Sequence, residues 1–213
     1  MNFWFFIKFL KKYFFYRISN TKRYSELIKK VIDSKAQNIL EVGVYTGRRS
    51  AELIECAKVF NKKIIYYGFD LFEDISDVKI KKELSKQPET MQKIKDKLLK
   101  LNCSILLFKG NTLKTLKLFK TNKRFDFIFI DGGHSIKTIA NDWKYTEKKL
   151  SKKGIIVFDD YYIGDKNIIK KFGCNNLISE LKKNSAYNVE FSKNTDYFPG
   201  KKYGIKLVFV RKL

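Results

Sequence analysis

Short apolar runs of strand length alternate with helical patterns along most of this chain. Strands are expected at residues 38–42, 63–69, 104–108, 125–130, 155–158, 187–191 and 206–210. Helices are expected between them, at residues 48–58, 88–100, 113–119, 136–150 and 176–183. Near-continuous apolar strands that alternate with helices are typical of a mainly parallel sheet covered on both faces. The sequence therefore predicts an α/β fold whose ligands bind outside the carboxyl ends of the strands.

A loop with two glycines follows the first expected strand. The strand ends in Glu41 and Val42, and Gly43 and Gly47 come next. Glycines let the backbone approach a ligand where a Cβ atom would obstruct it, and the next helix directs its first amides into the same crevice. The spacing differs from the G-x-G-x-x-G of a dinucleotide site. The loop therefore favours a ligand without a pyrophosphate, with Glu41 available for a cationic group of that ligand.

Polar residues also follow the second and third expected strands. Asp70 ends the second run, where a carboxylate can accept both ribose hydroxyls of an adenosine. The alternative for Asp70 is the capping of a turn. Gly110 and Asn111 follow the third run, where their polar groups can meet an adenine, whereas Thr112 is equally suited to be only the N-cap of the next helix.

Three aspartates follow the fourth and fifth expected strands. Asp131 comes after the fourth, and Asp159 and Asp160 come after the fifth. Neighbouring strands lie about 4.8 Å apart, so these carboxylates would converge and raise one another's pKa. A divalent cation removes this repulsion, and ligands that are all oxygen favour Mg²⁺, with Mn²⁺ or Ca²⁺ as alternatives. The pattern predicts a metal site formed by Asp131, Asp159 and Asp160.

His134 is the single histidine of the chain and lies three residues after Asp131. A histidine side chain accepts a proton near neutral pH, and a metal-bound hydroxyl group loses its proton more easily. We therefore expect His134 to act as a general base, with Asp131 as the alternative base. The competing interpretation is structural, because Asp-Gly-Gly turns are common in loops and a lone histidine usually has a structural role.

Taken in order, five motifs resemble those of class I S-adenosylmethionine (SAM)-dependent methyltransferases, particularly the metal-dependent sugar O-methyltransferases. The resemblance covers roughly residues 37–183. The motifs are ILEVGVYTGRRS (39–50), YGFDLFED (67–74), FKGNTLKTL (108–116), FDFIFIDGGHS (125–135) and GIIVFDDYY (154–162). The chain departs from the family after GFDLFED, where the usual Gly-Leu-Pro continuation is missing and a lysine-rich stretch gives no indication of the acceptor.

The resemblance implies a Rossmann-like fold with helices on both faces of a seven-stranded, mainly parallel sheet whose last strand is antiparallel. It implies Mg²⁺-assisted methyl transfer from SAM to a hydroxyl group of a sugar, glycan or small molecule. The implied SAM-binding residues are Glu41, Gly43, Gly47, Ser50, Asp70, Leu71, Gly110, Asn111 and Asp131. It also implies His134 and Asp131 as catalytic residues and Asp131, Asp159 and Asp160 as metal ligands.

The formal net charge of +23, from 45 Lys and Arg against 22 Asp and Glu, favours anionic partners such as nucleic acid. Methyltransferases that act on base amines hold the flipped base with a proline-containing loop after the fourth strand. The corresponding loop here, residues 131–134, has no proline. Because the charge favours a nucleic-acid methyltransferase and this loop does not, that function is kept as the alternative. A non-catalytic SAM-binding module is a third, which the acidic cluster disfavours.

Residues 1–25 form an aromatic and basic segment ahead of the domain expected at residues 26–213. Residues 1–16 are too short and too interrupted by lysines to span a membrane, and they lack the order of a signal peptide. An amphipathic helix on a membrane surface and a helix packed on the domain or on a second subunit both remain open. Three cysteines without a CxxC pair favour a reducing, cytoplasmic location.

Overall fold

The computed structural model describes residues 7, 10–11, 14–15, 18 and 21–213. Most of the amphipathic segment expected at residues 1–16 lies outside these described residues. Within them, every helix is too short or too polar to cross a lipid bilayer.

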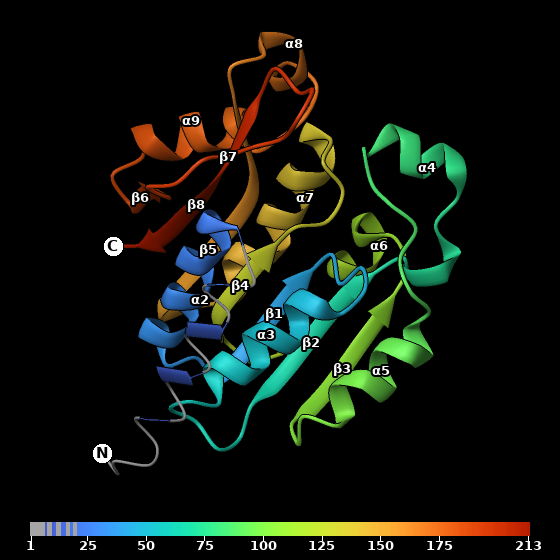
Figure 1. Ribbon diagram of the computed structural model, residues 1–213, viewed down its shortest axis with the longest axis vertical. Coiled ribbons are helices and arrows are strands. Elements are labelled where there is room, and N and C mark those ends of the chain that lie inside the picture. The colour runs from blue at the N-terminus through green and yellow to red at the C-terminus, as the bar shows by residue number, and fades with distance from the viewer. Residues whose placement is uncertain (1–6, 8–9, 12–13, 16–17, 19–20) are drawn as a thin grey trace.

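A central eight-stranded sheet organises the fold, in the order β3-β2-β1-β4-β5-β8-β6, with β7 paired to β8 (Figure 1). Strands β1 to β5 are parallel to one another, and β8 runs antiparallel to both β5 and β6. This confirms the expected mainly parallel sheet with an antiparallel last strand, to which β7 is a two-residue addition. The strands are β1 (Asn38–Val42), β2 (Ile65–Asp70), β3 (Ser104–Lys109), β4 (Phe125–Ile130), β5 (Leu150–Ile163), β6 (Tyr187–Phe191), β7 (Asp196–Tyr197) and β8 (Gly204–Lys212).

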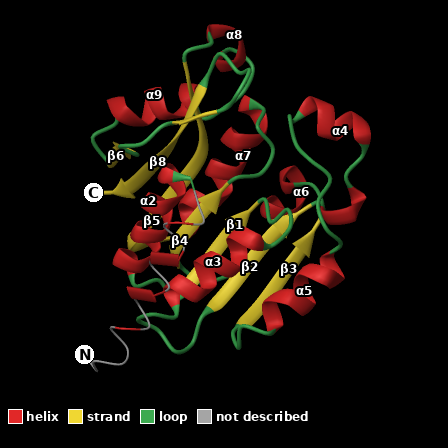
Figure 2. Ribbon diagram, in the orientation of Figure 1, coloured by secondary structure: helices red, strands yellow, loops and turns green. Residues whose placement is uncertain are grey.

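Helices cover both faces of the sheet (Figure 2). One core packs α2 (Lys22–Ser34), α3 (Arg48–Ala57) and α5 (Met91–Leu99) against the sheet. The other packs α6 (Thr112–Leu118), α7 (Ile136–Thr146) and α9 (Asn175–Lys183) against the opposite face. The short elements are α4 (Asp77–Lys82), α8 (Lys166–Ile169), η1 (Phe72–Asp74) and η2 (Glu147–Lys149).

Alternation along the strands explains why both faces are apolar. Successive side chains of a strand point to opposite faces. In β4, Phe127 and Phe129 accordingly join the core under α2, α3 and α5, while Ile128 and Ile130 join the core under α6, α7 and α9. All four side chains are at most 3% exposed, so the continuous apolar run is a central strand buried on both sides.

Strand β5 is longer than expected, and this changes where its two aspartates lie. The predicted strand ended at residue 158, but β5 continues to Ile163 along β8. Its pairing with β4 ends at Phe158, and its register with β8 shifts between Phe158 and Tyr161. A bulge re-aims side chains that would otherwise alternate, and both Asp159 and Asp160 line the same cavity. The aspartates thus lie at a bulge inside the strand, not after its end.

Helix α2 extends into the segment that was expected to lie ahead of the domain. Helix α2 begins at Lys22, so the boundary placed at residue 25 falls inside this helix. Arg23 is 4% exposed, and Leu27, Ile28 and Val31 pack in the core. The start of α2 therefore belongs to the packed domain, because its apolar stripe needs the sheet to cover it.

Gly43 sets how closely the β1 and β4 loops approach, which gives a direct test of the fold. Its φ is +92°, and an added Cβ atom would lie 2.0 Å from the carbonyl oxygen of Asp131. We expect Gly43→Ala to lower the free energy of unfolding by at least about 3 kcal/mol, measured by urea denaturation. Gly200→Ala is the control, since its φ is +74° with nothing within 4 Å, and it should cost only about 1–2 kcal/mol. Equal losses would contradict the close approach.

Candidate functional site

A cavity of about 370 Å³ opens at the carboxyl ends of β1 to β4, beside the bulge in β5. Loops that are far apart in the sequence therefore contribute to a single site, as parallel-sheet topology requires. Predicted site residues that line the cavity are Gly43, Asp70, Leu71, Gly110, Asn111, Asp131, His134, Asp159 and Asp160. Three predicted residues do not line it, namely Glu41, Gly47 and Ser50.

The Asp70 carboxylate holds the glycine loop in place. Its Oδ2 accepts hydrogen bonds from the amides of Val44 at 2.7 Å and Tyr45 at 2.8 Å. Its Oδ1 accepts from the amide of Phe72 at 3.0 Å. The turn-capping interpretation of Asp70 is therefore correct for these contacts. Since Asp70 also lines the cavity, its carboxylate remains close to any ligand that enters.

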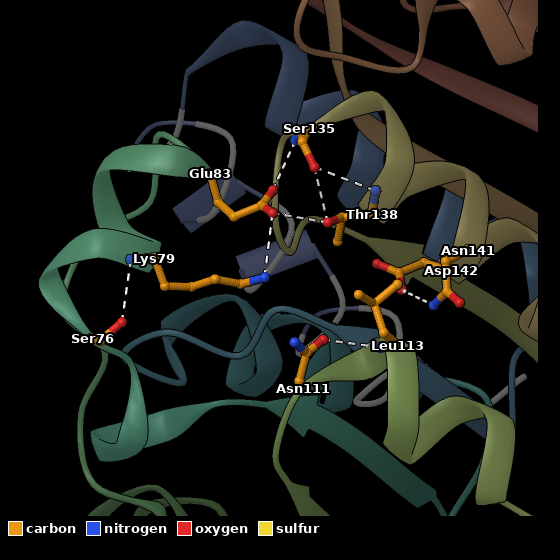
Figure 3. A network of polar contacts seen from close by, with 9 residues as sticks. All are labelled: Ser76, Lys79, Glu83, Asn111, Leu113, Ser135, Thr138, Asn141 and Asp142. Carbon is orange, nitrogen blue, oxygen red and sulfur yellow. Dashed lines mark hydrogen bonds and ion pairs between the residues drawn. The ribbon is translucent and has the colours of Figure 1, made fainter.

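The third strand leads into α6 through Gly110 and Asn111, both of which line the cavity. Gly110 has a φ of +133° and donates its amide to the carbonyl of Asp70 at 2.8 Å. Asn111 is the N-cap of α6, because its Oδ1 accepts from the amide of Leu113 at 3.0 Å (Figure 3). The cap is Asn111 and not Thr112, which is the first residue of the helix.

Glu41 lies in the core behind the glycine loop instead of in the cavity. Its side chain is fully buried, and its Oε2 accepts from the Ser50 hydroxyl at 2.5 Å and from the Tyr66 hydroxyl. Its Oε1 has no hydrogen-bond partner among the described residues. Burial raises the pKa of Glu41 to about 7, although the hydroxyl donors oppose this shift. Glu41 and Ser50 therefore support the loop from within.

Asp131, His134 and Asp160 form the acidic cluster of the cavity. One potential ligand atom from each lies within 4.8 Å of the others. His134 Nε2 is 3.4 Å from Asp160 Oδ2, and the Tyr162 hydroxyl lies 3.4 Å from His134 Nδ1 and donates to Asp160 Oδ1 at 3.3 Å. Burial, and then the charge of Asp160, raise the pKa of Asp131 to about 7. These groups are close enough to share a proton or a cation.

Asp159, one of the three predicted metal ligands, is already paired with cationic and hydroxyl groups. Arg23 forms an ion pair with its Oδ1, and the Tyr24 hydroxyl donates to its Oδ2 at 2.7 Å. Arg23 Nε also lies 2.7 Å from Asp196, and the Arg23 and Asp159 side chains are only 5% and 6% exposed. The cluster with metal-ligand spacing contains His134 in place of Asp159.

The sequence does not point to Arg23 or Tyr24, because residues 19–25 contain no motif. The Tyr24 ring lies 4.3 Å from the Arg23 guanidinium carbon and 3.6 Å from that of Arg49, which is cation–π geometry. The amphipathic stripe of α2 was the available signal, since it continues back from Val31 to Arg23. Glu83 also lines the cavity. It lies in the lysine-rich stretch for which the sequence predicts no site residue.

Residues 40–161, more than half of the chain, match a protein family described as "Methyltransferase domain". This range contains the glycine loop and the whole acidic cluster. A comparison with curated protein sequences found no significant match.

Solved structures share the fold at low sequence identity. A putative caffeoyl-CoA O-methyltransferase from Staphylococcus aureus superposes with a TM-score of 0.63 at 18% identity, covering 93% of this chain and 89% of that one. An O-methyltransferase from Bacillus cereus, solved in complex with SAH, gives 0.62 at 14%, covering 96% and 91%. The O-methyltransferase TomG from Streptomyces achromogenes, solved in complex with SAM, gives 0.59 at 14%, covering 87% and 78%.

The buried carboxyl of Glu41 predicts a measurable pH dependence of stability. A raised pKa means that the folded state prefers the protonated form, so this contribution is complete below about pH 4.5 and is lost as pH rises through about 7. Glu41→Gln removes the titration. We expect wild type to lose up to roughly 3 kcal/mol of unfolding free energy relative to Glu41→Gln between pH 4.5 and 8, measured by urea denaturation.

Glu180→Gln is the matched control for this measurement, since its side chain is 74% exposed. It should follow the pH dependence of the wild type. If Glu41→Gln also follows the wild type, the Glu41 carboxyl does not titrate in the way proposed.

Proposed function

Because the chain belongs to the family of methyltransferase domains, we propose that it transfers the methyl group of SAM to a hydroxyl oxygen of a small molecule or glycan. One observation carries the proposal. The glycine loop, Asp70 and Asn111 share a single cavity with Asp131, His134 and Asp160. A methyl donor and an activated hydroxyl group must meet within reacting distance, and this cavity offers different chemistry at its two ends.

The end formed by β1, β2 and β3 suits SAM. The Asp70 carboxylate, which the loop amides hold in place, is proposed to accept the ribose hydroxyls. Gly43 has no side chain to fill the space beside Asp131, and Asn111 lies at the proposed adenine end. A volume of about 370 Å³ lies within the usual range for small-molecule sites. Glu41 supports the loop from behind, without touching the cofactor.

At the other end, His134 is the proposed general base. The acceptor oxygen attacks the methyl carbon, the carbon–sulfur bond breaks, and the sulfonium becomes the neutral thioether of S-adenosylhomocysteine (SAH). His134 takes the proton that the hydroxyl group loses. Asp160 lies 3.4 Å from Nε2 and Tyr162 lies 3.4 Å from Nδ1, so both orient the ring. Asp131 remains the alternative base.

The acidic cluster also fits a divalent cation, with a ligand set that differs from the predicted one. Asp131 and Asp160 would hold the ion, and His134 is within reach as a third ligand, a role that would replace its role as the base. Burial, and then the charge of Asp160, raise the pKa of Asp131, and a cation held there would favour the ionised carboxylates. When bound there, the ion supplies Lewis acidity that eases loss of a proton from a hydroxyl group. Two carboxylates and an imidazole suit Mn²⁺ or Zn²⁺ as well as Mg²⁺.

The hydroxyl acceptor is inferred from the motifs that resemble sugar O-methyltransferases, together with the absence of proline from the loop at residues 131–134. Transfer of tritium-labelled methyl groups from SAM to a panel of glycans and small hydroxyl compounds tests this inference. Methyl transfer to RNA but to no member of the panel would contradict it and favour the nucleic-acid alternative.

The role of His134 as the general base can be tested by substitution. We expect His134→Gln to reduce turnover at least about 100-fold, because the neutral amide cannot take the proton. The affinity for SAH, measured by isothermal titration calorimetry, should stay at the wild-type value, since His134 lies at the acceptor end. Turnover close to wild type in His134→Gln would exclude it as the base and leave Asp131→Asn as the next variant to measure.

The second prediction separates the two candidate metal sets. We expect Asp160→Asn to weaken Mn²⁺ binding at least about tenfold, measured by electron paramagnetic resonance of free Mn²⁺. Asp159→Asn is the matched control and should bind Mn²⁺ like the wild type, because Arg23 and Tyr24 already occupy that carboxylate. The opposite ranking of the two variants would restore the set predicted from the sequence.

A further inference from the structure

One segment of the cavity lining has almost no buried apolar side chains. We call residues 75–88 the lid segment; it includes α4 and contributes to the cavity lining with Ile75, Lys79, Leu84 and Lys86. None of the residues of α4 is buried. Within the lid segment, only Glu83 and Pro88 are classed as buried. Apolar burial, which usually fixes a helix on a domain, therefore contributes little here.

Polar contacts of Glu83, instead of apolar burial, hold the lid segment on the domain. Its side chain points from the end of α4 toward the start of α7 (Figure 3). Its Oε2 accepts from the Ser135 amide at 2.9 Å, and its Oε1 accepts from the Thr138 hydroxyl at 3.0 Å. Lys79 lies 3.4 Å from the same Oε1. A carboxylate that is 2% exposed thus has partners for both oxygens.

The backbone around Glu83 strengthens the same connection. The Glu83 carbonyl accepts from the amide of His134 at 3.3 Å. A Cβ atom added to Gly133 would lie 2.8 Å from Glu83 Oε2, so the second glycine of the 131–134 loop leaves room for this carboxylate. Leu84, the next residue, has a φ of +50°, which a non-glycine residue adopts only when its surroundings hold it there.

Electrostatics favour the ionised form of this anchor. Burial opposes ionisation, but the hydrogen bonds from Ser135 and Thr138 outweigh it and lower the pKa of Glu83. The carboxylate also lies at the N-terminus of α7, whose helix dipole stabilises negative charge. The contact is thus a charge-assisted one, which is stronger than a neutral hydrogen bond.

We propose that Glu83 is a positioning residue, which fastens the lid segment to the loop that carries Asp131 and His134. The carboxylate and the carbonyl of Glu83 both bond to the segment that contains His134. Closure of the lid segment therefore also fixes the position of His134. Release of Glu83 opens the acceptor end of the cavity without disturbing the glycine loop or Asp70. The side chain of Glu83 also lines the cavity, and its proposed role is to hold His134 and the lid segment in place.

Hydrogen–deuterium exchange of the full-length protein without ligand tests this coupling. In Glu83→Gln the amide group keeps the shape but loses one of the two acceptors. We expect the amides of residues 76–87 to exchange at least about tenfold faster than in the wild type, with the amides of β1 and β4 unchanged. Thr138→Val, which removes the partner hydroxyl, should act in the same direction. The double variant should exchange no faster than Glu83→Gln, because both changes break one contact.

Glu89→Gln is the matched control, since Glu89 follows directly on the lid segment and pairs with Lys93 at the surface. Its lid amides should exchange as in the wild type. Lid exchange in Glu83→Gln that equals this control overturns the proposal. Faster exchange spread evenly over the sheet also overturns it, because Glu83 would then be a general stability residue.

The kinetic consequence rests on the proposed function, whereas the exchange measurement does not. We expect Glu83→Gln to raise the KM for the hydroxyl acceptor and to lower kcat, while the affinity for SAH stays at the wild-type value. Equal losses of acceptor and SAH binding would contradict a selective role at the acceptor end. A wild-type protein that methylates no acceptor would contradict the proposed function, and the exchange result would still decide the role of Glu83.

Discussion

Carboxylates repel one another, and the parallel sheet brings several of them to one edge of this otherwise strongly basic molecule. Most are stabilised by a different neighbour. Glu41 is buried against hydroxyl donors and favours its protonated form, while Asp70 accepts backbone amides of the glycine loop. Arg23 pairs with Asp159, and Glu83 lies at a helix N-terminus. Two of these contacts join segments that follow different strands, since Asp70 at the end of β2 holds the loop after β1, and Glu83 after β2 holds the loop after β4. Arg23 joins α2 to β5.

The remaining acids are Asp131 and Asp160, with His134 beside them. Burial, and then the charge of Asp160, raise the pKa of Asp131, although His134, Arg23 and Arg49 oppose this shift. Acids with pKa values perturbed in this way concentrate at functional sites. The other carboxylates therefore build the site, and Asp131 and Asp160 are the acids that we propose for its chemistry.

The sequence predicted the parts of this arrangement that depend on local pattern. Apolar runs located β1, β3, β4 and β6 closely, and the rule that ligands bind at strand ends brought Asp70 and Asp131 to one cavity. It did not predict the bulge in β5, the pairing of Arg23 with Asp159, or the role of Glu83. Arg23 and Asp159, like Glu83 and Ser135, lie more than 50 positions apart in the chain, and the bulge in β5 depends on pairing with the distant strand β8. No local periodicity or motif records which distant partner a charged side chain will meet.

The central claim is that the ends of β1 to β4 and the bulge in β5 form one site for a methyl donor and a hydroxyl acceptor. A crystal structure of the protein with SAH tests it most directly. We expect SAH in the cavity, with its ribose hydroxyls on Asp70, its adenine beside Asn111, and its sulfur directed toward Asp131 and His134. Ordered SAH bound outside this cavity, or with its sulfur directed away from the acidic cluster, would show that the strand ends do not form this site.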